Sequence, residues 1–135
     1  MDVAVVEIDT CLDPDNRTGF RSPAQIEAVI SKMDLVVTTR LHGLVLSLKN
    51  GVPVVAVDPV KGGQKVLRQA ETLAWPHRFT PETASEKALS DAIFKCLRPG
   101  AAAAAREVGE RARQALKEVE ITFASAARTA VSCRR

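Results

Sequence analysis

Two short apolar runs, separated by a segment with helical periodicity, constrain the fold of this 135-residue chain more than any other feature. The runs lie within residues 35–38 and 54–57, and wholly apolar runs of this length are typical of parallel strands that are buried on both faces. Between them, residues 41–49 repeat apolar side chains at helical spacing, and Asn50-Gly51 ends the helix with residues that tolerate a left-handed backbone. The order strand, helix, strand predicts a parallel βαβ unit.

The same alternation precedes this unit. Residues 3–8 are mostly apolar and predict a first strand, which a polar loop follows. Ser22 and Gln25 have the spacing of a capping box, and Pro23 stands where a helix tolerates proline best, at its first position. A helix is therefore expected to begin at this point and to lead into the strand at residues 35–38.

The alternation also continues beyond the βαβ unit. The pattern predicts a helix over residues 64–73, a short strand within residues 75–79 and a further helix that begins at Thr80-Pro81. Strict alternation of short apolar runs and capped helical segments predicts a three-layer α/β fold with a mostly parallel sheet and helices on both faces.

After Pro99-Gly100 the composition changes. Residues 101–127 are rich in Ala, Glu, Arg and Lys and carry a narrow apolar stripe, which predicts a long helix on the surface. We expect an α/β domain over residues 1–100, followed by this helix and a frayed tail over residues 101–135. The stripe is expected to pack against a second copy, giving a homodimer, or against an N-terminal domain missing from this chain.

Composition excludes several classes of protein. The net charge of +3 is spread along the chain and only 4% of residues are aromatic, so no nucleic-acid partner is expected. The three cysteines are widely separated and form no C-x-x-C pair, which predicts reduced thiols in a cytoplasmic protein and no metal site. There is no apolar run long enough for a membrane span, and no cofactor is expected.

The candidate site lies where the strand at residues 35–38 passes into the following helix. Thr39, Arg40, Leu41 and His42 occupy this position. Ligands bind at the carboxyl ends of parallel strands, and the amide groups that begin a helix favour anions. A guanidinium and a titratable imidazole at this place predict an anionic ligand.

A second loop is expected at the same edge of the sheet. Asp58, Gly62, Gly63 and Lys65 follow the strand at residues 54–57. Because the two strands are predicted to be parallel, their carboxyl ends meet, and backbone amides of the Gly-Gly turn could cradle a phosphate with Lys65 as a supporting charge.

Each candidate also has a purely structural explanation. Arg40 could form an ion pair with Asp34 or Asp58, and His42 could be a histidine without a functional role near a helix start. Asp58 could orient a ligand hydroxyl or cap the turn before the following proline. His77 is expected to be a loop residue.

Taken together, these segments resemble the C-terminal half of the polysaccharide pyruvyl transferases. The resemblance covers residues 22–75 and is sharpest around Thr39-Arg40-Leu41-His42-Gly43 and the Gly-Val-Pro that begins at residue 51. It implies the Rossmann-like C-terminal half of a fold similar to GT-B glycosyltransferases. It also implies transfer of pyruvyl from phosphoenolpyruvate to two hydroxyls of a sugar as a ketal, in exopolysaccharide or cell-wall biosynthesis.

The resemblance further implies that Arg40, Leu41 and His42 form part of the phosphoenolpyruvate site, with Arg40 as the anion ligand and His42 as the general acid. Two alternatives stay open. One is a GT-B glycosyltransferase-like domain that binds a nucleotide sugar, and the other is a non-catalytic module that retains an anion site. The first alternative requires a carboxylate for the ribose hydroxyls, and only Asp58 is well placed for that role.

Overall fold

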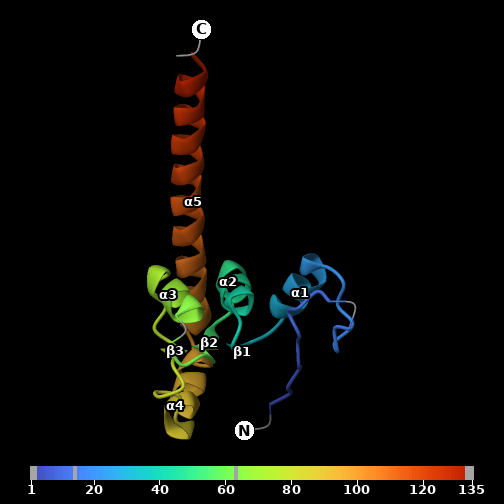
Figure 1. The fold of residues 1–135 in the computed structure, drawn as a ribbon. Coiled ribbons are helices and arrows are strands. Elements are labelled where there is room, and N and C mark those ends of the chain that lie inside the picture. Colours follow the sequence, from blue (N-terminus) through green and yellow to red (C-terminus); the bar gives the residue numbers. More distant parts are fainter. Residues whose placement is uncertain (1–2, 14, 63, 133–135) are drawn as a thin grey trace.

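The computed structural model describes residues 3–13, 15–62 and 64–132. It is a mixed α/β structure in which five helices and three strands alternate for most of the chain (Figure 1). In chain order the elements are α1 (Pro23–Ile30), β1 (Val36–Thr38), α2 (Leu41–Lys49), β2 (Val54–Val57), α3 (Lys65–Thr72), β3 (Arg78–Phe79), α4 (Glu86–Cys96) and α5 (Ala101–Ser132).

The sheet is parallel throughout, with the strand order β1-β2-β3. Thr38 of β1 is in register with Ala56 of β2, and Val57 of β2 is in register with Phe79 of β3. This arrangement confirms the predicted βαβ unit and the short strand within residues 75–79. The carboxyl ends of β1 and β2 therefore lie at one edge of the sheet, as the candidate site requires.

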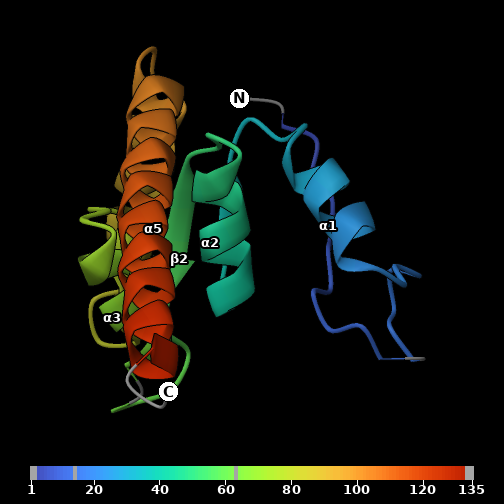
Figure 2. The ribbon, with the colours of Figure 1, turned by 90° about the horizontal axis from the view of Figure 1, so that it is seen from above.

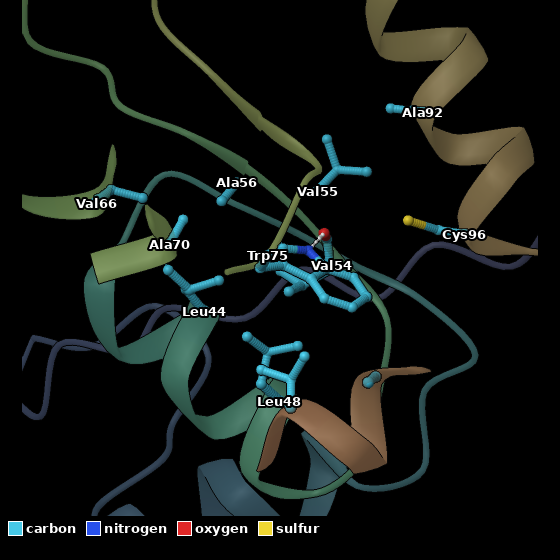
Figure 3. Packing of buried hydrophobic residues seen from close by; sticks show 12 residues of the cluster. Leu44, Leu48, Val54, Val55, Ala56, Val66, Ala70, Trp75, Ala92 and Cys96 are labelled. Carbon is cyan, nitrogen blue, oxygen red and sulfur yellow. Dashed lines mark hydrogen bonds between the residues drawn. The ribbon is translucent and has the colours of Figure 1, made fainter. Parts of the chain in front are cut away.

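Strand β2 is the centre of the core, because helices pack on both of its faces. Val54, Val55 and Ala56 are fully buried. Figure 3 shows Ala56 directed toward α3 and Val55 directed toward α4, while Leu48 of α2 lies below Trp75 and Leu44 lies to its left. The predicted layers are thus present around β2.

Trp75 ties the loop before β3 to the central strand. Its indole ring is 3% exposed, and its Nε1 donates a hydrogen bond to the carbonyl oxygen of Val54 at 2.7 Å (Figure 3). A buried tryptophan needs a partner for this donor. The contact therefore fixes both the ring and the path of the chain into β3.

Residues 3–8 do not form a strand, which corrects the prediction made from their apolar pattern. They have no regular secondary structure, and Val5 is 82% exposed. The prediction that the run at residues 35–37 is buried on both faces is also wrong, because Val37 is 58% exposed. Val37 lies on β1, which is an outer strand of the described sheet.

The helix boundaries follow from local capping. The capping box of α1 is complete, with Ser22 Oγ accepting from the Gln25 amide and the Gln25 side chain accepting from the Ser22 amide. Helix α4 begins at Glu86 with Ser85 as its cap, not at Thr80-Pro81 as predicted. The reason is that Thr83 Oγ1 accepts a hydrogen bond from the Thr80 amide, and this contact closes a turn ahead of the helix.

Helix α1 stands to one side of α2, away from β2 and α5, in both views of the fold (Figures 1 and 2). Ile26 and Ile30 are its buried residues. Glu27 accepts hydrogen bonds from Lys49 Nζ at 2.9 Å and from Asn50 Nδ2 at 3.1 Å, at the end of α2. The bond from Lys49 lowers the pKa of Glu27 most, followed by the bond from Asn50.

The long helix α5 packs against α2 and α4 only through its first turns. Ala105 and Val108 are buried there, and a Cβ atom on Gly109 would overlap the carbonyl oxygen of Leu48. Glycine thus lets α5 lie against the carboxyl-terminal end of α2. The rest of α5 extends well beyond the domain (Figure 1).

Candidate functional site

The turn between β1 and α2 is held by the side chain of Thr38. Its Oγ1 accepts a hydrogen bond from the Arg40 amide at 3.0 Å and donates one to the Arg40 carbonyl at 3.3 Å. These two bonds hold Arg40 in an extended backbone conformation, with φ −113° and ψ 138°, directly before the helix. Thr38 therefore determines where the Arg40 side chain leaves the sheet.

The start of α2 has no side-chain cap. Arg40 is the N-cap residue, and no side chain of the described residues caps the first turn through a hydrogen bond. The first amides of a helix have no partner within the helix and carry a partial positive charge. By contrast, Ser22 caps α1 and Ser85 caps α4. The amino end of α2 is thus suited to an external acceptor such as a phosphate or carboxylate oxygen.

Arg40 and His42 both lie exposed at this amino end, with Thr39 exposed beside them and Leu41 half-buried. In the part of the chain that the structure describes, the Arg40 guanidinium forms no ion pair, so neither Asp34 nor Asp58 binds it. The structural explanation of Arg40 as half of an ion pair therefore has no support among these residues.

Asp58 lies at the end of β2 and is 4% exposed. Its carboxylate accepts hydrogen bonds from the amide of Val60 at 3.3 Å and from the amide of Val66 at 3.2 Å. The first bond closes the turn after the strand, and the second caps the first turn of α3. Of the two explanations considered for Asp58, these contacts match the turn cap.

The remaining predicted residues lie in the loop that Asp58 holds. Gly62 has a φ of +74°, a conformation that side chains other than glycine rarely adopt, and Lys65 is the first residue of α3. Gly63 lies outside the described residues. Because Asp58 already occupies one amide at the start of α3, this helix offers an anion less than α2 does.

An open hollow of about 330 Å³ adjoins this loop. It is lined by Gly62, Gln64, Lys65 and Arg68, and Arg68 Nε donates to Gln64 Oε1 at 2.8 Å. The hollow brings together two of the predicted site residues, whereas Arg40 and His42 do not line it. Sequence reasoning missed Gln64 and Arg68, although their i, i+4 spacing at the start of a helix places them on one face with Lys65 close by.

The second histidine lies elsewhere. His77 precedes β3 and therefore stands at the amino edge of the parallel sheet, the edge away from Arg40. Its ring meets that of Trp75 edge to face, with centroids 5.5 Å apart. Burial, with a smaller effect of the Lys95 charge, lowers the pKa of His77. This position matches the expectation of a structural loop residue.

The described residues contain neither a cluster of metal-ligating side chains nor a helix that could span a membrane. No group of three or more His, Cys, Asp or Glu side chains is arranged to hold a metal ion. Nor does any described helix combine the length and the apolar character that crossing a membrane demands.

Comparison with known protein families finds a similarity in the first part of the chain. Residues 4–59 match the family model described as polysaccharide pyruvyl transferase. This segment contains α1, β1, α2 and β2, and with them Arg40, His42 and Asp58, but it ends before Gly62. No curated protein and no solved structure matches the chain. The resemblance to this family is thus confirmed over residues 4–59.

Proposed function

We propose that this chain carries the phosphoenolpyruvate-binding part of a polysaccharide pyruvyl transferase, on the premise that residues 4–59 match that family. The observation that carries the proposal is the amino end of α2. There the matched segment combines a helix start without a side-chain cap, the Arg40 guanidinium, which forms no ion pair with any described residue, and the His42 imidazole. The Rossmann-like half of a GT-B-like fold remains part of the proposal, because a parallel sheet alone fits several α/β folds.

The reaction would convert the enol of phosphoenolpyruvate into a ketal. The methylene carbon gains a proton and becomes a methyl group, and two sugar hydroxyls form C–O bonds to the neighbouring carbon. The bond between that carbon and the phosphate oxygen breaks, inorganic phosphate leaves, and the two hydroxyl protons pass to bases or solvent. The protein has to supply one proton and neutralise the anionic groups of the substrate.

Arg40 is suited to bind the anionic groups of the substrate. A guanidinium is planar, remains charged and can bind a carboxylate or a phosphate through two parallel hydrogen bonds. Thr38 fixes the backbone of Arg40 on both sides of the residue, at its amide and its carbonyl. The side chain is therefore anchored at a defined place but free to bind a ligand, with the first amides of α2 beside it.

His42 is suited to supply the proton that the methylene carbon gains. Imidazole is a common general acid in enzymes, because its N–H can be given up to a reacting atom. It stands in the first turn of α2, two residues after Arg40, and is exposed. We assign His42 as the general acid and Arg40 as the ligand of the substrate anion.

The second loop has a supporting role in this proposal. Lys65 and Gly62 border the hollow after β2. Thr39 precedes Arg40 in the chain, and Leu41 stands between Arg40 and His42. Asp58 holds the loop in place through Val60 and Val66. Gly63 completes the Gly-Gly turn in the sequence.

Calorimetric titration with phosphoenolpyruvate tests the anion site. Arg40→Ala should weaken binding by at least about tenfold, because the charged hydrogen bonds are lost. Arg111→Ala, which removes an exposed arginine from α5, is the matched control and should bind like the parent. Equal binding by Arg40→Ala and the parent would show that the site is wrongly assigned.

Product analysis separates binding from catalysis. Incubation with phosphoenolpyruvate and sugar acceptors should release phosphate, and His42→Ala should lose that release while it still binds the substrate. Binding that depends on Arg40 without ketal formation would support the non-catalytic alternative. Binding of a nucleotide sugar in place of phosphoenolpyruvate would support the glycosyltransferase-like alternative.

A further inference from the structure

The main chain of Arg40 is held at both of its polar groups, although its side chain is exposed. Its amide donates to Thr38 Oγ1 at 3.0 Å, and its carbonyl accepts from the same hydroxyl at 3.3 Å. The carbonyl also accepts from the Leu44 amide at 3.2 Å, which closes the first turn of α2. Arg40 is therefore fixed relative to the end of β1 as well as to the helix.

Thr38 is not a donor to an anion in this arrangement. A hydroxyl has a single hydrogen atom to donate. In Thr38 this hydrogen is directed to the carbonyl oxygen of Arg40. Because anionic oxygens bind to donors, any effect of Thr38 on an anion at the start of α2 has to pass through Arg40.

The methyl group of Thr38 helps to keep the hydroxyl in place. Threonine is stiff about χ1, because its Cβ is branched. Both branches border the first turn of α2: a Cβ atom on Gly43 would lie 3.3 Å from Thr38 Cγ2, and Oγ1 lies beside it too. This packing holds Oγ1 next to the main chain of Arg40. Serine lacks the methyl group and would hold its hydroxyl less firmly.

We propose that Thr38 is a positioning residue, which sets the affinity of the anion site for phosphoenolpyruvate through Arg40; the inference rests on the proposed function. A long side chain loses conformational freedom when it binds a ligand, and freedom of its main chain would add to that loss. Because Thr38 fixes the main chain of Arg40 beforehand, less freedom is lost on binding. The role requires a hydroxyl on a β-branched side chain, which only threonine supplies.

Calorimetric titration with phosphoenolpyruvate tests this requirement. Thr38→Val retains the shape without the hydroxyl and should weaken binding about two- to tenfold. Thr38→Ser retains the hydroxyl and should bind with an affinity between those of the parent and Thr38→Val. Thr122→Val is the matched control, since it removes an exposed hydroxyl that donates to the Glu118 carbonyl at 2.8 Å within α5, and it should bind like the parent. Binding by Thr38→Val as tight as that of the parent would refute the proposal.

A double-mutant cycle shows whether Thr38 acts through Arg40. When Arg40→Ala has already weakened binding, the addition of Thr38→Val should cause no further loss. An equal loss in both backgrounds would overturn the positioning role. The cycle also separates the two proposals. If Arg40→Ala binds like the parent, the proposed function fails and the positioning role fails with it, whereas a loss with Arg40→Ala and none with Thr38→Val refutes the positioning role alone.

Hydrogen exchange followed by NMR tests the same contact without any ligand. The Arg40 amide should exchange about fivefold faster in Thr38→Val than in the parent, because its acceptor is lost, and Thr38→Ser should restore most of the protection. The Val52 amide is the reference, since it donates to the Ser47 carbonyl at 2.9 Å at the other end of α2. Faster exchange at Arg40 alone supports the proposal, and an unchanged rate at Arg40 or an equal increase at both amides would contradict it.

Discussion

The side chain of Thr38 occupies the space that a Cβ atom on Gly43 would need. The same Oγ1 atom holds the amide of Arg40 at 3.0 Å. The end of β1 and the first turn of α2 are therefore packed together so closely that only glycine fits at position 43. The position of the proposed anion ligand depends on this contact, because Thr38 can hold Arg40 only while the helix starts this near to the strand.

Gly43→Ala is expected to destabilise the protein by about 1 to 3 kcal/mol, the range typical of overpacking. Alanine favours helices more than glycine does by about 1 kcal/mol, so a loss of stability would identify the overlap as its cause. Urea unfolding, followed by the fluorescence of the single tryptophan, Trp75, measures the effect.

The second variant for this prediction is Gly43→Ala/Thr38→Ala. It removes Oγ1 and Cγ2 of Thr38 but leaves its Cβ, which would still lie 2.9 Å from the new methyl group. Stability should therefore recover only in part relative to Gly43→Ala. If Gly43→Ala alone unfolds at the same urea concentration as the parent, the packing is looser than described.

Asp58→Ala is expected to cost about 1 to 2 kcal/mol, because it removes the cap of α3 and one bond within the loop. Asp58→Asn retains an acceptor oxygen and should cost less. Asp91→Ala is the control, since Asp91 is an exposed carboxylate that pairs with Lys87 on the surface, and such pairs contribute little. Thermal unfolding of the three variants provides the comparison, and equal midpoints for Asp58→Ala and Asp91→Ala would contradict the capping role.

Cys96 is expected to resist alkylation in the native protein. It is 2% exposed, and burial raises the pKa of its thiol to about 11. At pH 8 only about one thousandth of such a thiol is thiolate, the reactive form. In a Cys133→Ser chain, iodoacetamide should label Cys11, which is exposed, and reach Cys96 only after denaturation. Rapid native labelling of both thiols, read by mass spectrometry, would disprove burial of Cys96.

Stability is expected to fall as the pH drops below about 6.5, owing to His77. Its pKa is lowered in the folded state, chiefly by burial, so the unfolded chain binds a proton more readily than the native one. The contribution is complete above the unfolded pKa of about 6.5 and decreases below it. Urea midpoints at pH 7.5 and pH 5.5 measure the change.

Two variants isolate this pH dependence. His77→Gln removes the titrating group and should lose much of the decrease, whereas His42→Ala leaves His77 in place and should retain it. A parent protein whose midpoint is the same at both pH values would show that burial does not disfavour the charged imidazole.

The boundaries of α2 could be predicted from the sequence because they depend on neighbouring residues. Arg40 and Asn50 flank the helix, and residues 41–49 form it as predicted. The capping box at Ser22 is equally local. Residues 3–8 could not be placed in this way, since a strand exists only where another strand pairs with it, and that partner is not encoded nearby.

The residues of the candidate site also differ in whether neighbouring residues or distant contacts determine them. Its principal residues, Arg40 and His42, follow from a strand end that the pattern marks clearly. The hydrogen bonds of Asp58 could not be foreseen, because its acceptor oxygen reaches the amide of Val66, eight residues on, across a loop whose path depends on Gly62. Gln64 and Arg68 could not be foreseen either, because the hollow that they line lies beside the same loop.

Strand β1 has an edge at which a further strand could be added to the sheet. It pairs with β2 on one side, and among the described residues no strand pairs with its other side. Main-chain groups along such an edge can pair with any strand of suitable length, and a three-residue edge presents few of them. The sheet is therefore open to extension along β1, the same strand whose end carries Arg40.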